Sequence, residues 1–169
     1  MTSGRTFESL LAPTHGDAVA ISAPGAKPLT YDGLRALVAK TIAALNGFGV
    51  GRGDRVAIVL PNGPEMATAF IAIASGAVSA PLNPGYRADE FEFYLSDLGA
   101  KALVVEAGGA SPAVDAAKKL GIAVLTLTPD ANAGAGSFTL SGGQQGAAAR
   151  QRRQETGDKA VNMEQRHNV

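Results

Sequence analysis

The chain of 169 residues contains no cysteine. Disulfide frameworks, thiolate zinc sites and thiol nucleophiles are therefore excluded together. The chain also lacks a net charge, because Lys and Arg total 15 and Asp and Glu total 15. Without a global charge of either sign, nothing favours nucleic acid, an anionic membrane or an acidic substrate as a partner. We expect neither nucleic acid nor a membrane.

We expect no targeting signal in this sequence. No apolar run follows Arg5 and Glu8, so a secretory signal is not expected. The last three residues (HNV, 167–169) are not a peroxisomal address. A chain without cysteine suits a reducing compartment, and we expect a cytoplasmic location.

Residues 66–86 carry no charged side chain and are numerous enough to span a bilayer. Gly76, Pro81 and Pro84 interrupt this stretch, and much of it is alanine, which contributes little to membrane insertion. A buried helix followed by a buried strand explains the same residues better.

The apolar pattern alternates between strand and helix periods. Leu34, Leu37, Val38, Ile42 and Leu45 recur at three- and four-residue steps, which predicts a helix with Thr30 as its N-cap. The other predicted elements are strands at 18–22, 55–60, 77–82, 102–105 and 122–127, and helices at 65–75, 89–98 and 111–120. This alternation predicts an α/β fold, with a mostly parallel sheet and helices on both faces.

The pattern stops after Pro129. Residues 131–169 are rich in Gly, Ala, Gln and Arg and hold few large apolar side chains. We therefore predict an ordered part over residues 1–130 and a disordered tail over 131–169, which a change of reading frame in a longer gene would explain.

Four short stretches carry a family resemblance. In order along the chain they are residues 29–34 (LTYDGL), 49–58 (GVGRGDRVAI), 60–65 (LPNGPE) and 76–84 (GAVSAPLNP). Their order and spacing resemble the N-terminal part of the adenylate-forming superfamily, which contains AMP-forming acyl-coenzyme A synthetases, luciferases and adenylation domains of peptide synthetases. The resemblance covers about residues 6–130, and residues 86–97 (YRADEFEFYLSD) look most like the branch of oxalate–CoA and coumarate–CoA ligases.

One residue departs from the family pattern. Many members have Glu three residues after the capping Thr, whereas this chain has Gly33. The reciprocal bond of a capping box is then missing.

The resemblance also shows what is lacking. Complete members bind ATP with a Ser/Thr/Gly-rich loop that ends in Pro-Lys-Gly, together with Mg²⁺, coenzyme A and a C-terminal catalytic lysine. No Pro-Lys-Gly occurs among the 169 residues. We therefore predict no catalytic residue, no metal site and no bound cofactor for this chain, although ATP, Mg²⁺ and CoA serve complete relatives.

The other candidate motifs are better explained without a catalytic or ligand-binding role. Residues 141–146 (SGGQQG) have no following Lys, and we expect no strand before them. Gly134 and Gly136 are expected from composition, and residues 150–153 (RQRR) are interpreted as part of a solvated tail. His15 and His167 lack a partner at metal-ligand spacing. Asp89, Glu90 and Glu92 are interpreted as a helix start rather than a catalytic pair.

Asn83, Tyr86 and Arg87 are the candidate binding residues. They follow a predicted strand end, where α/β sheets place binding surface. By the resemblance, this region faces coenzyme A in complete relatives, and Arg87 would contact one of its phosphates. The alternative is a plain turn with an exposed arginine.

Two functions remain open: a truncated AMP-dependent acyl-CoA synthetase that is inactive alone, and a non-catalytic α/β module that binds a partner. A defined C-terminal element would favour the module. If the sheet is incomplete beyond residues 122–127, we expect an open edge, an uncovered apolar face and self-association. The strand residues expected to border that face are Val56, Ile58, Val59, Val104, Val105, Val124 and Leu125.

Overall fold

A computed structural model describes residue 11 and residues 15–142, and it confirms the α/β class. A small antiparallel pair joins β1 (Val19–Ile21) to β2 (Leu29–Thr30). The main sheet has the strand order β4-β3-β5-β6-β7, and only β7 runs antiparallel to its neighbour. Its strands are β3 (Arg55–Val59), β4 (Val78–Pro81), β5 (Ala102–Glu106), β6 (Ala123–Pro129) and β7 (Phe138–Gly142). The helices are α2 (Tyr31–Gly47), α3 (Pro64–Gly76), α4 (Ala88–Asp97) and α5 (Pro112–Lys119).

Glycine stands at position 33, the third residue after the N-cap of α2. The N–H of Gly33 donates to the Thr30 hydroxyl at 3.2 Å, so half of the capping box is present. A Cβ on Gly33 would come within 2.6 Å of the Leu29 Cδ1 atom. Leu29 is buried, so a larger residue at position 33 would have to displace a core side chain.

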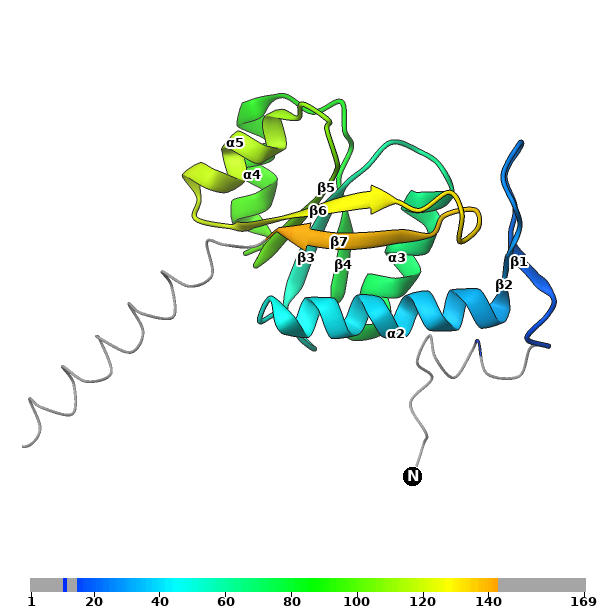
Figure 1. Cartoon of the computed structure of the whole chain (residues 1–169). Helices are drawn as coiled ribbons and strands as arrows, with labels where there is room; N and C mark the ends of the chain where they lie inside the picture. Colours follow the sequence, from blue (N-terminus) through cyan, green and yellow to red (C-terminus); the bar gives the residue numbers. More distant parts are fainter. Residues whose placement is uncertain (1–10, 12–14, 143–169) are drawn as a thin grey trace, which may run out of the picture.

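Helices cover both faces of the sheet (Figure 1). One face packs against α2 and α3, and we call this cluster the α2–α3 core; the other packs against α4 and α5 and is called the α4–α5 core. The main sheet contributes Val56, Ile58, Ala102, Val104, Leu125, Leu127 and Phe138 to the α2–α3 core, together with Leu60, which directly follows β3. The main sheet's residues in the α4–α5 core are Ala57, Val59, Leu103, Val105 and, partly buried, Val124.

The expectation of an uncovered apolar face is therefore wrong for the part of the chain that the structure describes. Six of the seven strand residues named for that face are at most 5% exposed, and the seventh, Val124, is half-buried in the α4–α5 core. Helix α2, together with the helices that follow β3, β4 and β5, covers both faces. Among the described residues, the two edge strands of the sheet, β4 and β7, have no strand paired to their outer sides.

The predicted disorder of residues 131–169 is wrong for residues 131–142. These residues form a loop and strand β7, which pairs with β6 from Leu125↔Gly142 to Pro129↔Phe138. The predicted tail from residue 143 onward lies outside the described residues. The predicted boundary at residue 130 is too early, because a short strand that pairs through its backbone needs few apolar side chains.

The loop before β7 packs tightly despite its Gly/Ala composition. The N–H of Ala135 donates to the Lys27 carbonyl oxygen at 2.8 Å, and the Thr68 hydroxyl donates to that of Gly136 at 2.5 Å. Gly136 has φ +76°, and a Cβ there would lie 2.6 Å from the Pro64 carbonyl oxygen. A side chain at this position would therefore prevent the loop from contacting α3.

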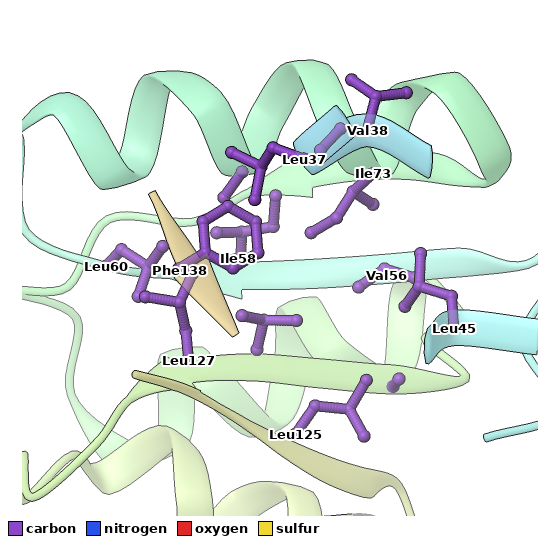
Figure 2. Packing of buried hydrophobic residues seen from close by; sticks show 14 of the residues in the cluster. Leu37, Val38, Leu45, Val56, Ile58, Leu60, Ile73, Leu125, Leu127 and Phe138 are labelled. Carbon is purple, nitrogen blue, oxygen red and sulfur yellow. The ribbon is translucent and has the colours of Figure 1, made fainter. Parts of the chain in front are cut away.

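Phe138 anchors β7 in the α2–α3 core. Its side chain is 5% exposed and belongs to the same cluster as Leu37, Ile58 and Leu60 (Figure 2). A strand that contributes a buried aromatic ring is an integral part of the domain rather than the start of a tail.

The uncharged stretch over residues 66–86 is built as predicted, from a helix followed by a strand. It forms most of α3 and all of β4. No helix within the described residues is both long and apolar enough to cross a membrane.

Candidate functional site

The strand order creates a switch point at β3. The chain moves from β3 through α3 to β4 on one side, and then through α4 to β5 on the other side of β3. The two connecting helices lie on opposite faces of the sheet. In α/β sheets, such a point leaves a crevice at the carboxyl ends of the strands, where ligands bind.

A pocket of about 270 Å³ occupies this position. It is formed by the carboxyl ends of β3 and β5 and by the turns that follow β3, β4 and β5. Its lining residues are Val59, Pro61, Pro84, Val105, Glu106, Gly109, Ala110, Ser111 and Pro112. The volume is near the lower end for a small-molecule site, so the pocket suits one ring or short chain rather than a whole cofactor.

The pocket lining is apolar apart from Glu106 and Ser111, and it includes no Lys or Arg. The Ser111 hydroxyl already accepts a hydrogen bond from the N–H of Ala113 at 3.3 Å and caps α5. Glu106 lines the same pocket as Ser111 and Pro112, the residues at the amino-terminal end of α5. The pocket can therefore bind an apolar group with a hydrogen-bond donor, but phosphate would need a cation from outside it.

Asn83 belongs to the turn after β4, next to the pocket residue Pro84. Its side-chain oxygen accepts a hydrogen bond from the N–H of Gly85 at 2.9 Å, and its carbonyl oxygen accepts one from the N–H of Tyr86 at 3.2 Å. The amide oxygen of Asn83 therefore shapes the turn.

Tyr86 packs against α4. Its ring stacks on Tyr94 with centroids 5.0 Å apart and meets Phe91 edge-on at 5.8 Å. A hydrogen bond with the Tyr94 phenol raises the pKa of Tyr86 above its usual value, and the Tyr94 charge and burial act in the same direction. Tyr86 therefore stays protonated at neutral pH and orders the turn rather than acting as a base.

Arg87 is exposed and is the N-cap residue of α4. Its N–H donates to the Glu90 carboxylate at 2.8 Å, while Asp89 and Glu90 occupy the first turn. The interpretation of these two acids as a helix start is thus confirmed. The Arg87 side chain is the cation nearest in sequence to the pocket residue Pro84.

The structure therefore places Asn83, Tyr86 and Arg87 in one turn at the pocket edge of the sheet, but none of the three lines the pocket. Sequence reasoning missed Glu106 and residues 109–112. The available signal was the turn and cap after the buried strand at 102–105, which by the strand-end rule also belongs to the binding edge.

The remaining candidates have structural roles or lie outside the described residues. Ser141 and Gly142 belong to β7, so the expectation that no strand precedes residues 141–146 is wrong. His167 and residues 150–153 lie outside the described part. Within that part, no group of three or more His, Asp or Glu side chains could hold a metal ion.

Comparison with known proteins assigns the family. The sequence pattern of the AMP-binding enzyme family matches residues 11–163. This match includes most of the chain, and it extends past β7 into the region first interpreted as a tail. The chain belongs to the AMP-binding enzyme family and corresponds to the N-terminal part of the AMP-forming acyl-CoA synthetases.

Individual relatives agree with this assignment. The protein named "Probable CoA ligase CCL9" of Humulus lupulus is 41% identical over 76% of this chain and 25% of the relative. The oxalate–CoA ligase of Arabidopsis thaliana is 41% identical over 66% of this chain and 22% of the relative. The crystal structure of apo MatB from Rhodopseudomonas palustris matches with a TM-score of 0.65 and 26% identity, over 76% of this chain and 26% of that one. The chain thus spans about a quarter of the length of these relatives.

Proposed function

We propose that this chain is a segment of an AMP-forming acyl-CoA synthetase that provides part of the binding edge and does not catalyse adenylation alone. The observation that carries the proposal is the family match over residues 11–163 in a sequence without Pro-Lys-Gly. Acyl-adenylate formation requires stabilisation of charge at a phosphoryl centre. The lining of the switch-point pocket holds no cation that could supply it.

The test is ATP–pyrophosphate exchange by the purified chain with oxalate, acetate or coumarate as the acid. We expect no exchange above a heat-killed control, whereas a full-length oxalate–CoA ligase assayed at the same concentration exchanges readily. Exchange that persists after contaminating host synthetases are removed would overturn the proposal.

The turn formed by Asn83, Tyr86 and Arg87 is proposed to lie on the coenzyme A side of the complete enzyme. Pro84 of this turn lines the pocket, and Arg87 offers an exposed guanidinium that suits a phosphate. Ligand-detected NMR with coenzyme A should show binding that Arg87→Ala abolishes. Arg52→Ala is the matched control, because Arg52 is also exposed but precedes β3, at the opposite end of the strands. Equal binding by both variants, or no binding by the wild type, would remove the coenzyme A assignment.

A second candidate function is a non-catalytic interaction module, and β7 is the observation that favours it. Strand β7 adds an edge strand to the sheet and contributes a buried aromatic residue to the core. The module would associate with another chain, including a second copy, through an open edge of the sheet.

The two edges are not equivalent as interaction surfaces. In β4, the N–H groups of Val78 and Leu82 point to β3, so by alternation the backbone of Pro81 faces the open side. Proline has no N–H, and it blocks pairing there. The open side of β7 has neither proline nor charge among residues 138–142. We therefore assign self-association to β7 rather than β4.

A further inference from the structure

Helix α3 has the composition of a helix that is buried on all sides. After Glu65 in its first turn, residues 66–76 carry no charged side chain. Helices α2, α4 and α5 each carry at least three charged residues. A helix that meets water has a charged or polar face, whereas a helix without one is buried. The sequence of α3 therefore predicts contacts on every side.

The described structure covers only one side of α3. The residues on that side pack towards the α2–α3 core and the loop before β7; they are Thr68, Ala69, Ala72 and Ile73. Ala67 and Phe70 are exposed on the outer side, Phe70 by 37%. Ala74 follows Phe70 by four residues and so continues the same stripe. The outer side of α3 is therefore a strip of uncharged side chains with one aromatic ring.

Strand β4 extends this strip at the edge of the sheet, where it lies next to α3 (Figure 1). Pro81 is exposed and is the Cα partner of Ile58, a residue of the α2–α3 core, so Pro81 points to the side of the sheet that α3 covers. Because α3 connects two parallel strands, it runs back along the sheet before β4 begins. The strand advances by about 10 Å from Val78 to Pro81, and the helix rises by about 9 Å from Phe70 to Gly76. Phe70 and Pro81 therefore stand at the same height.

Together, Ala67, Phe70, Ala74 and Pro81 form a surface without charge, which we call the Phe70 face. An aromatic ring among small side chains suits close packing against an apolar partner. A partner strand is opposed here, because Pro81 has no N–H to donate. The Phe70 face therefore fits a partner that packs over α3 rather than one that extends the sheet.

The comparisons favour one occupant, the remaining part of a complete synthetase. This chain spans about a quarter of the length of its relatives, so about three quarters of such a protein lie outside it. Layers of secondary structure pack on one another through apolar faces. The opposite helix layer is unsuited to this contact, because α4 carries four carboxylates and no Lys or Arg.

We propose that the Phe70 face is the surface on which the rest of the complete synthetase packs, so that α3 becomes buried on both sides. This inference rests on the proposed function, because it takes the chain to be a segment of such an enzyme. The outer side of α4 stays in contact with solvent.

The test uses the reactivity of a single thiol, since the native chain has no cysteine. Ala67→Cys places a thiol on the Phe70 face, and Ser96→Cys places the control thiol on the exposed side of α4. In the full chain alone, both variants should react with N-ethylmaleimide at similar rates. In a fusion, residues 11–142 replace the matching segment of the Arabidopsis thaliana oxalate–CoA ligase. There, mass spectrometry of the labelled peptides should show Ala67→Cys reacting at least about tenfold more slowly, with Ser96→Cys unchanged.

Equal reaction of the two variants in the fusion would overturn the proposal. If that fusion still catalyses ATP–pyrophosphate exchange, the proposed function stands and only the assignment of the Phe70 face fails. The intact ligase provides a second measurement that does not depend on the folding of the fusion. A cysteine placed there at the position aligned with Ala67 should react only after denaturation, and rapid reaction in the native ligase would also overturn the proposal. So would slow reaction of Ala67→Cys in the chain alone that becomes fast on dilution, because a second copy would then cover the face.

Discussion

The hydroxyl of Thr68 in α3 donates a hydrogen bond of 2.5 Å to the carbonyl oxygen of Gly136, which stands 68 residues later in the loop before β7. Thr68 is fully buried, and its hydroxyl has a single proton. Its distances to the carbonyl oxygens of Pro64 and Glu65 are longer, at 3.0 and 3.2 Å. This bond therefore joins α3 to the loop that leads into β7.

Gly136→Ala should destabilise the protein more than a comparable glycine substitution elsewhere. An alanine in the left-handed backbone conformation lowers stability by about 1–2 kcal/mol. Steric crowding in a packed site lowers it by about a further 1–3 kcal/mol. At Gly136 both terms apply, because a Cβ would lie 2.6 Å from the Pro64 oxygen. At Gly121, with φ +71° and open space around the Cβ position, only the first applies. Urea denaturation of both variants measures the difference, and equal losses would show that the loop does not pack on α3.

The elements with a clear apolar period could be predicted from the sequence. Thr30 caps α2 as predicted, Ser111 caps α5, and Pro64 and Pro112 begin α3 and α5. Local signals sufficed because capping and helical periodicity depend on residues within a few positions of each other.

Strand β7 and the pocket could not be predicted in this way. β7 is held by backbone bonds to β6 and by one ring in a core built from residues far earlier in the chain. The glycines before β7 have the composition of a random coil. Their role, close contact with α3, produces no periodic pattern in the neighbouring sequence. The pocket depends on β5 lying beside β3, and an alternating pattern of strands and helices does not specify that order.

The Asp54–Lys101 pair should make the free energy of unfolding depend on pH in the acidic range. A hydrogen bond from the Lys101 ammonium at 2.6 Å, followed by one from the N–H of Gly51, lowers the pKa of Asp54 below 3.8. Because the folded value is the lower one, this contribution to stability is present above about pH 4 and is lost as the pH falls through the folded pKa. NMR titration should show that Lys101→Gln raises the pKa of Asp54, and an unchanged value would contradict the assigned cause.

Charge on one edge of the sheet should prevent self-association, whereas the same charge on the other edge should not. Thr139→Lys places an ammonium on the exposed side of β7, where a charged side chain opposes pairing with another strand. Val78→Lys is the matched change on β4, whose Val78 side chain is 45% exposed. Sedimentation velocity at tens of micromolar should show fewer oligomers for Thr139→Lys only. Dispersal by Val78→Lys alone would reverse the assignment of the edges.

The central claim is that β7 is part of the folded domain, and Phe138→Ala tests it most directly. Removing a buried phenylalanine costs about 3–5 kcal/mol, whereas an exposed one costs little. Phe138 is 5% exposed and Phe93 is 63% exposed, so Phe93→Ala is the matched control. In chemical denaturation of the full chain, we predict a loss of several kcal/mol for Phe138→Ala and less than about 1 kcal/mol for Phe93→Ala. Equal stability of the two variants would contradict the claim, because β7 would then contribute nothing to the stability of the folded domain.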